Sequence, residues 1–137
     1  MDASQPQQML APGQRVVMIS GASRGIGRAI ARRLAAEGYR LSLGVRDVGR
    51  FDGSGFDPET TLVHHFDALD PESASAWVAA TAQRFGRIDA LINNAGILRQ
   101  IDFASGDEGA LDDVWAVNVK APFRLIRHAL PHLAQAG

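Results

Sequence analysis

The sequence predicts an α/β protein with a doubly wound parallel sheet, in which helices cover both faces of the sheet in a three-layer αβα arrangement. Three observations lead to this prediction. Short, β-branched apolar runs alternate with helix-like segments along the chain. The first run passes directly into a glycine-rich turn and then into a helix-like segment. The 137 residues, 46% of them hydrophobic, suffice for one domain with a sizeable core.

The first strand, turn and helix form the clearest unit of the pattern. The run RVVMIS, residues 15–20, is stopped by a glycine and predicts a buried strand. The helix that follows carries an apolar face formed by Ile26, Ile30 and Leu34, and Gly38 is a natural C-terminal stop. Residues 1–14 are rich in Gln, Pro and small polar residues. We expect them to be a flexible tail ahead of the domain formed by residues 15–137.

Three more strands and two more helices are predicted. The strands are RLSLGV, TLVHHF and IDALIN, at residues 40–45, 61–66 and 88–93. Glycines and a proline between the second and third strands leave room for at most a short helical turn. The helices cover residues 71–86 and 110–137, and Pro122 and Pro131 should bend or interrupt the second of them.

Charge and composition exclude several classes of function. The formal net charge is −1 and the 14 Lys and Arg residues are scattered, so no surface for nucleic acid or an anionic membrane is expected. The absence of cysteine excludes disulfides, thiolate metal sites and a cysteine nucleophile. No stretch resembles a signal peptide or the about 20 apolar residues of a membrane span. We therefore expect a soluble, cytoplasmic protein.

The histidines and tryptophans do not predict a site. His128 and His132 have the i, i+4 spacing of a helical metal pair, but Pro131 separates them and no third ligand is near, so no metal is expected. Trp77 and Trp115 fall on predicted helices and are interpreted as core or packing residues.

The glycine-rich turn predicts a phosphate-binding site. Its glycines have the spacing Gly-x-x-x-Gly-x-Gly, with Gly21, Gly25 and Gly27 between a buried strand and a helix. Free backbone N–H groups at a helix N-terminus, with no Cβ in the way, suit a pyrophosphate. The alternative is that the glycines serve only the packing of a tight strand-to-helix turn. The position directly after a strand favours phosphate binding.

The end of the second strand bears on the choice between NADP and NAD. A guanidinium there would pair with the 2′-phosphate of NADP, whereas a carboxylate would accept from the ribose hydroxyl of NAD. Arg46 and Asp47 are both present. If the strand ends at Val45, Arg46 is the first loop residue and Arg24 could approach the same phosphate, which favours NADP. The alternative is that Arg46 and Asp47 are ordinary exposed loop charges.

The third and fourth strand ends carry weaker signals. Asp67 and Ala68 could contact adenine through a carboxylate and an open backbone, although Asp67 alone could equally be a helix cap, as Asp70 before a proline suggests. Asn94, with Ala95 and Gly96, could bridge strands and let a nucleotide approach the backbone. In isolation the same residues could form a turn.

Together these motifs resemble the N-terminal half of a short-chain dehydrogenase/reductase. SGASRGIG is similar to the Thr-Gly-x-x-x-Gly-x-Gly cofactor motif of that family, with Ser20 for the threonine. FDALD and INNAG resemble the adenine-contacting segment and the Asn-Asn-Ala-Gly segment. Asn118, in VWAVNVKAPF, matches the asparagine of the catalytic tetrad. The resemblance covers about residues 15–137 and implies a Rossmann-type domain, truncated here after about four strands.

The resemblance also implies a cofactor and a set of site residues. The cofactor is NADP, with NAD possible, and the reaction is hydride transfer between nicotinamide and an alcohol or ketone substrate. The implied cofactor residues are Gly21, Ser23, Arg24, Gly25, Ile26 and Gly27 at the pyrophosphate and ribose, Arg46 at the 2′-phosphate, Asp67 and Ala68 at adenine, and Asn94, Ala95, Gly96 and Val117 along the ribose side. Asn118 is the sole catalytic member.

The rest of the family's catalytic set is missing from the chain. In the family a tyrosine acts as general acid/base, a lysine four residues later lowers its pKa, and a serine orients the carbonyl. The only tyrosine here is Tyr39 and the only lysine is Lys120, so no Tyr-x-x-x-Lys can exist. We therefore expect the chain alone to be inactive as an enzyme. The alternatives are a non-catalytic NADP(H)-binding module and an inactive fragment, and the last helix resembles one that family members bury between subunits.

Overall fold

The computed structural model describes residues 9–137, and four parallel strands form its centre. The strands are β1 (Val16–Ser20), β2 (Arg40–Val45), β3 (Thr61–His65) and β4 (Ala90–Ile92). Their order in the sheet is β3-β2-β1-β4, with β1 pairing in parallel to β2 and β4. The predicted parallel sheet is confirmed, and its two edges are β3 and β4.

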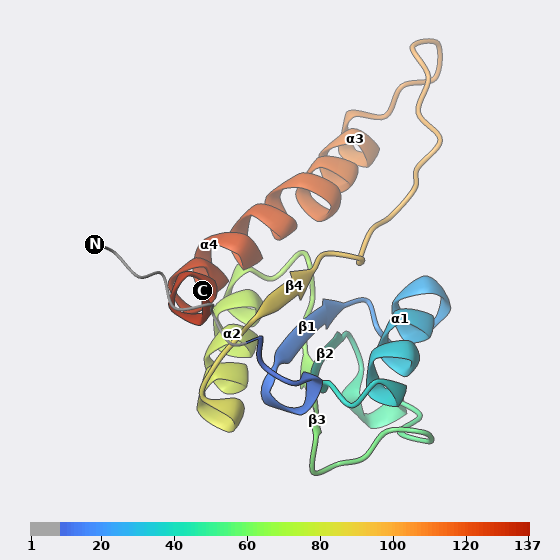
Figure 1. Ribbon diagram of the computed structural model, residues 1–137. Helices are drawn as coiled ribbons and strands as arrows, with labels where there is room; N and C mark the ends of the chain where they lie inside the picture. The colour runs from blue at the N-terminus through green and yellow to red at the C-terminus, as the bar shows by residue number, and fades with distance from the viewer. Residues whose placement is uncertain (1–8) are drawn as a thin grey trace, which may run out of the picture.

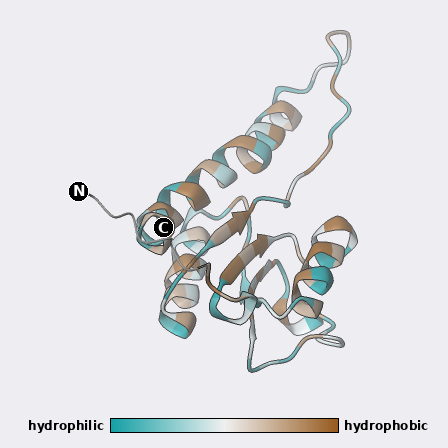
Figure 2. Ribbon diagram, in the orientation of Figure 1, coloured by the Kyte–Doolittle hydropathy of each residue, from teal (hydrophilic) through white to brown (hydrophobic). Residues whose placement is uncertain are grey.

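Helices cover both faces of the sheet (Figure 1). On one side lies α1 (Gly25–Ala36), and on the other lie α2 (Pro71–Phe85) and α4 (Ala121–Ala136). The strands alternate their side chains between these layers: Leu41 and Leu43 pack on the α1 side, while Ser42 faces Trp77 of α2. Figure 2 shows hydrophobic strands between helices of mixed character. The three-layer αβα arrangement is therefore as predicted.

Two buried clusters hold the layers together. The cluster on the α1 side includes Val17, Ile19, Ala31, Leu41 and Leu43, and the cluster on the α2 and α4 side is centred on Met18, Trp77, Ile88 and Leu125. Trp77 is fully buried, and its indole N–H donates to Ser42, whose hydroxyl lies 2.7 Å from that of Thr81. A Cβ on Gly44 would lie 2.7 Å from the Trp77 ring. Gly44 thus makes room for the indole beneath β2.

The connection between β2 and β3 holds only a 3-10 turn, Val48–Arg50, as the glycine-rich sequence predicted. Residues 1–8 of the predicted tail lie outside the described part of the chain, and Pro12–Gln14 form a 3-10 turn just before β1. The Gln14 side chain accepts from the Ala11 N–H and closes this turn. The backbone carbonyl of Arg15 then accepts from the Arg40 N–H, which ties the segment to β2.

The last predicted helix is three segments: α3 (Glu108–Trp115), a π-turn (Ala116–Lys120) and α4. The N–H of Ala121 bonds to the carbonyl of Ala116, the i to i−5 pattern of a π-bulge. Pro122 follows at once, and since proline lacks an N–H and crowds the preceding turn, the wider turn accommodates it. Pro131, in contrast, lies inside α4 without interrupting it, on an exposed face.

Two side chains lie elsewhere than their helical pattern suggested. Trp115 is 59% exposed and Ile26 is 75% exposed, so neither belongs to the core. Ile26 sits in the first turn of α1, whereas Ile30 and Leu34 pack against the buried cluster on the α1 side of the sheet. Among residues 9–137, every helix is too short or too polar to cross a bilayer.

Candidate cofactor site

The residues singled out from the sequence gather at the carboxyl ends of the strands, where open parallel sheets bind ligands. The glycine-rich turn follows β1 and leads into α1, Arg46 follows β2, Asp67 lies just beyond β3, and Asn94 follows β4. Figure 1 shows these strand ends directed toward the first turn of α1 and the loop before α3. The other end of the sheet carries Tyr39, beside Asp89 in an open hollow of about 260 Å³.

Two glycines of the turn have backbone angles that only glycine adopts easily. Gly21 has φ 68° and Gly25 has φ 59°. Gly27 is required for a different reason, since a Cβ there would overlap the carbonyl oxygen of Gly21 and lie 2.5 Å from Nδ2 of Asn94. The start of α1 therefore presses directly against the end of β1.

The first turn of α1 presents its N–H groups without a side-chain cap. Arg24 is the N-cap residue and makes no capping hydrogen bond, because a guanidinium has no acceptor. Ser23, Arg24, Gly25 and Ile26 are all exposed, and Gly27 is buried. Uncapped N–H groups at the positive end of a helix dipole form a site for an anionic group.

Ser20 and Asn94 fasten the segment after β4 to this turn. The Ser20 hydroxyl accepts from the backbone N–H of Asn94 and of Ala95, each at 3.0 Å. The Asn94 amide donates to the carbonyl of Gly21 at 3.2 Å. A Cβ on Gly21 would lie 3.0 Å from Cα of Ala95, so the two segments are in close backbone contact. Serine, in place of the family's threonine, supplies the hydroxyl that this junction uses.

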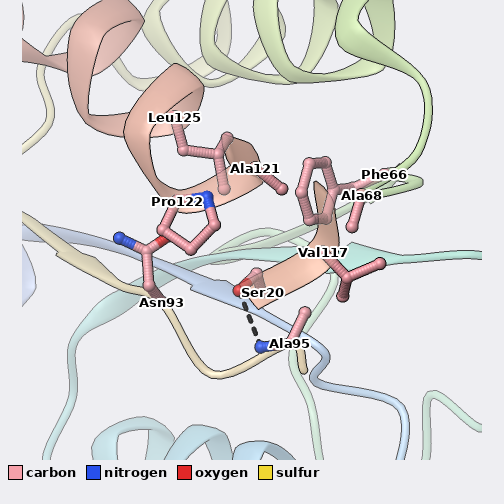
Figure 3. Close-up of a pocket in the computed structure, with 9 residues that line it drawn as sticks. All are labelled: Ser20, Phe66, Ala68, Asn93, Ala95, Val117, Ala121, Pro122 and Leu125. Carbon is pink, nitrogen blue, oxygen red and sulfur yellow. Dashed lines mark hydrogen bonds between the residues drawn. The ribbon is translucent and has the colours of Figure 1, made fainter. Parts of the chain in front are cut away.

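A small, mostly apolar pocket opens beside the junction (Figure 3). Its lining brings together three residues predicted from separate motifs, Ala68, Ala95 and Val117. Figure 3 shows the Ser20 side chain bonded to Ala95 at the floor and α4 across from it. Five further lining residues were not predicted from the sequence: Phe66, Asn93, Ala121, Pro122 and Leu125. Phe66 and Asn93 directly follow β3 and β4, and this position at a strand end is the feature of the sequence that could have identified them as lining residues.

The end of β2 has the register that the NADP prediction required. The strand ends at Val45, and Arg46 is the first residue beyond it, with an exposed side chain. The Asp47 carboxylate accepts from the Arg50 N–H at 3.2 Å and lies 3.4 Å from Nε of Arg50. Asp47 thus caps the 3-10 turn, while the backbone carbonyl of Arg46 bonds to Nδ1 of His65.

Asp67 makes a local turn at the end of β3. Its carboxylate accepts from the Leu69 N–H at 2.9 Å, and its N–H donates to the Ser73 hydroxyl. The helix cap itself is Asp70, which accepts from the Glu72 N–H. The alternative reading of Asp67 as the cap is therefore wrong, because the residue before the proline performs that task.

Asn118 lies in the π-turn, and its side-chain amide forms hydrogen bonds with the backbone just after Gly96. Its Oδ1 accepts from the Ile97 N–H at 2.9 Å, and its Nδ2 donates to the Ile97 carbonyl at 2.8 Å. A Cβ on Gly96 would lie 3.2 Å from the same Oδ1. Both ends of the Asn118 amide are therefore engaged with backbone. Lys120 is exposed on the same π-turn, and Tyr39 is at the opposite end of the sheet.

No group of three or more His, Asp or Glu side chains in the described residues could hold a metal ion. His128 and His132 both lie on α4, as the spacing predicted, without a further ligand among residues 9–137. What the strand ends offer is helix N–H groups, a cation at Arg46 and small residues that admit a ligand close to the backbone. That combination suits a phosphate-bearing nucleotide.

Comparison with known proteins identifies the family of the chain. The family model described as short chain dehydrogenase matches residues 15–137. The chain is 44% identical over 125 residues to an agropine synthesis reductase of Rhizobium rhizogenes, covering 89% of this chain and 29% of that protein. It is 33% identical to a 3-oxoacyl-[acyl-carrier-protein] reductase of Staphylococcus aureus, covering 85% of this chain and 49% of that protein.

Solved structures give the same result. A short-chain dehydrogenase from Brucella melitensis superposes with a TM-score of 0.81 at 34% identity, over 87% of this chain and 52% of that one. An alcohol dehydrogenase from Thermococcus sibiricus, complexed with 5-hydroxy-NADP, has a TM-score of 0.82 at 32% identity, over 89% and 54%. The chain spans about half or less of the length of these relatives. It belongs to the short-chain dehydrogenase family of oxidoreductases.

Proposed function

We propose that residues 15–137 bind a nicotinamide dinucleotide, NADP in preference to NAD, as the cofactor-binding half of a reductase or dehydrogenase. The observation that carries the proposal is the uncapped first turn of α1, in close contact with the end of β1 at Gly27, with Arg46 at the end of the neighbouring strand β2. An anionic pyrophosphate gains from the N–H groups and the helix dipole, and a 2′-phosphate gains from the guanidinium.

In this proposal each strand end has a separate task. The turn holding Gly21, Ser23, Arg24, Gly25, Ile26 and Gly27 seats the pyrophosphate and neighbouring ribose. Arg46 pairs with the 2′-phosphate, since the Asp47 carboxylate is already engaged with Arg50. Asp67 and Ala68 face adenine, and Asn94, Ala95, Gly96 and Val117 border the other ribose.

The bound dinucleotide would supply hydride chemistry between its nicotinamide and an alcohol or ketone carbon. This chain's contribution is to bind and orient it. Asn118 is the proposed member of the catalytic group, and its amide holds the Ile97 backbone next to the site. The only tyrosine and the only lysine lie at opposite ends of the sheet and on no common helix. We therefore propose that the 137 residues alone do not turn over substrate.

The same observation supports a second candidate, a non-catalytic module that senses NADP(H). The two candidates share the cofactor site, and they differ in whether additional catalytic residues act together with the chain. A mixture of the chain, NADPH and a simple ketone distinguishes them from an active enzyme, since absorbance at the reduced nicotinamide band should stay constant. Oxidation of NADPH by this chain would contradict the proposed need for further catalytic residues.

We also propose that the exposed side of α3, the π-turn and α4 meets a second copy of the chain. Six large apolar side chains are exposed there: Leu111, Trp115, Val119, Phe123, Ile126 and Leu130. A run of this size is more than a monomer usually leaves in water. Sedimentation should reveal a dimer that Phe123→Lys converts to a monomer, and a monomeric wild type would refute the idea.

The experiment that tests the cofactor proposal is a calorimetric titration with NADPH and with NADH. The wild type should bind NADPH more tightly. Arg46→Met should weaken NADPH by about tenfold, the effect of one lost charge-assisted contact, and leave NADH unchanged. Arg33→Met, on the exposed side of α1, removes an equal charge away from the site and is the control. The absence of binding to either nucleotide would overturn the proposal.

A further inference from the structure

Arg28, in α1, reaches across to the loop between β2 and β3. Its Nη2 donates to the backbone carbonyl of Asp52 at 2.8 Å and to the Asp52 carboxylate at 3.2 Å. The Arg28 side chain is only 14% exposed, whereas that of Asp52 is 68% exposed. Most arginines of a helix of this kind lie in solvent, so a largely buried guanidinium needs an explanation.

Two aromatic rings enclose the same guanidinium. The Arg28 Cζ lies 5.3 Å from the ring centroid of Phe51 and 5.4 Å from that of Phe56. The two rings are 5.8 Å apart and tilted by 38°. Both rings also pack against the buried cluster on the α1 side of the sheet. The loop therefore folds around one cation, which attracts both ring faces.

Asp52, on the exposed side of the loop, also forms hydrogen bonds within the loop. Its carboxylate accepts from the N–H and from the hydroxyl of Ser54, each at 2.9 Å. These bonds, first that of the backbone, hold the pKa of Asp52 below its usual range, and the charges of Arg28 and Arg32 lower it further. The carboxylate thus stays charged and available to Arg28 through the neutral range.

One nitrogen of the Arg28 guanidinium makes no hydrogen bond in this arrangement. Nη1 of Arg28 is buried and has no hydrogen-bond partner among residues 9–137. A buried N–H without a partner costs stability and offsets part of the gain from the hydrogen bonds and the two rings. The arrangement also fixes the position of the loop relative to α1.

The position of the β2–β3 loop relative to α1 affects the proposed site because only a short segment separates this loop from Arg46. The 3-10 turn Val48–Arg50, capped by Asp47, is all that separates Arg46 from Phe51. Holding Phe51 and Asp52 against α1 therefore limits where Arg46 can lie. The same helix begins at the glycine-rich turn, so Arg28 links the loop after β2 to the helix whose first turn is the proposed pyrophosphate site.

We propose that Arg28 is a positioning residue for cofactor selectivity: its clamp on Phe51, Asp52 and Phe56 sets Arg46 at the distance from the glycine-rich turn that an NADP 2′-phosphate requires. This inference rests on the proposed cofactor function. Arg28 acts through the loop and does not itself touch the nucleotide.

The test compares Arg28→Met with Arg33→Met, which removes the same charge from an exposed position of the same helix. Arg28→Met should lower the ratio of NADPH affinity to NADH affinity by about tenfold, because the contact of Arg46 with the 2′-phosphate is lost. A purely structural defect would weaken both nucleotides alike and leave the ratio unchanged. Amide hydrogen exchange should also speed up at Ser54 and Phe56 in Arg28→Met and stay at the wild-type rate in Arg33→Met.

Asp52→Asn serves where Arg28→Met does not fold, since Asp52 is exposed and outside the proposed cofactor contacts. It should shift the ratio in the same direction by a smaller factor. An unchanged ratio in the folded variants, with wild-type binding intact, would overturn the inference and leave the cofactor proposal standing. A wild type that binds neither nucleotide would overturn the cofactor proposal, and the selectivity role with it.

Discussion

The substitution Gly27→Ala tests the close contact between β1 and α1 on which the proposed phosphate site depends. The added methyl would overlap the Gly21 carbonyl oxygen and lie 2.5 Å from Asn94 Nδ2. The first of these neighbours is backbone, so no side-chain rotation relieves the overlap. The start of α1 must move away, and the hydrogen bond from Asn94 to Gly21 must lengthen or break.

The size of the effect follows from three opposing contributions. Overpacking of this kind costs about 2 kcal/mol, and loss of the side-chain hydrogen bond costs about 1 kcal/mol. The higher helix propensity of alanine returns about 1 kcal/mol. We therefore expect the free energy of unfolding to fall by about 2 kcal/mol, which for a chain of this length lowers Tm by roughly 8 °C.

Calorimetry and urea unfolding measure this change. Gly53→Ala is the matched control, because a Cβ at Gly53 meets nothing within 4 Å and should change stability by less than about 0.5 kcal/mol. NADPH affinity should fall with Gly27→Ala and stay constant with Gly53→Ala. If Gly27→Ala were as stable as wild type or more so, helix propensity would have prevailed and the contact would not exist in solution.

Three further effects are expected. Ser20→Ala removes the acceptor of two backbone N–H groups and should cost about 2 kcal/mol in urea unfolding, whereas Ser20→Thr keeps the hydroxyl and should cost less. Trp77→Phe removes the hydrogen bond to Ser42 and part of a fully buried ring, so it should lower the free energy of unfolding by about 2 kcal/mol. The exposed Trp115→Phe should lower it by less than about 0.5 kcal/mol, and equal effects would contradict the assignment of Trp77 to the core and Trp115 to the surface. Partial burial alone would raise the pKa of Asp89, but hydrogen bonds from Arg87 and a backbone N–H outweigh it and hold the pKa below its usual range. Asp89 therefore stabilises the fold above the ordinary pKa of an aspartate, and its contribution is lost as pH falls through the lowered pKa; Asp89→Asn should remove this part of the acid dependence, and identical pH profiles would argue against the pairing.

The sequence predicted best those features that depend on neighbours along the chain. The strands β1, β2 and β3 were placed to within one residue, because each is a short apolar run with a glycine or a charge at its end. The glycine-rich turn, with its close approach at Gly27, is also local. β4 is shorter than the predicted residues 88–93 because it pairs with β1 over only three residues.

Features that depend on distant partners could not be predicted. The sequence could show that Pro122 disturbs a helix, but it could not show that a π-turn would absorb it and direct Asn118 at Ile97. Trp115 and Trp77 look alike in their helices, and only the packing on Gly44 distinguishes the buried one. Arg28 reads as one more surface arginine until the loop 24 residues away folds around it.

The central claim is that a phosphorylated adenosine binds at the carboxyl ends of the strands. Titration of the isotope-labelled chain with 2′,5′-ADP, followed by amide chemical shifts, tests it most directly. We expect the largest changes at Gly25, Gly27, Arg46 and Ala68, with none near Tyr39 at the opposite end of the sheet. Changes centred on Tyr39, or no changes at millimolar ligand, would contradict the account.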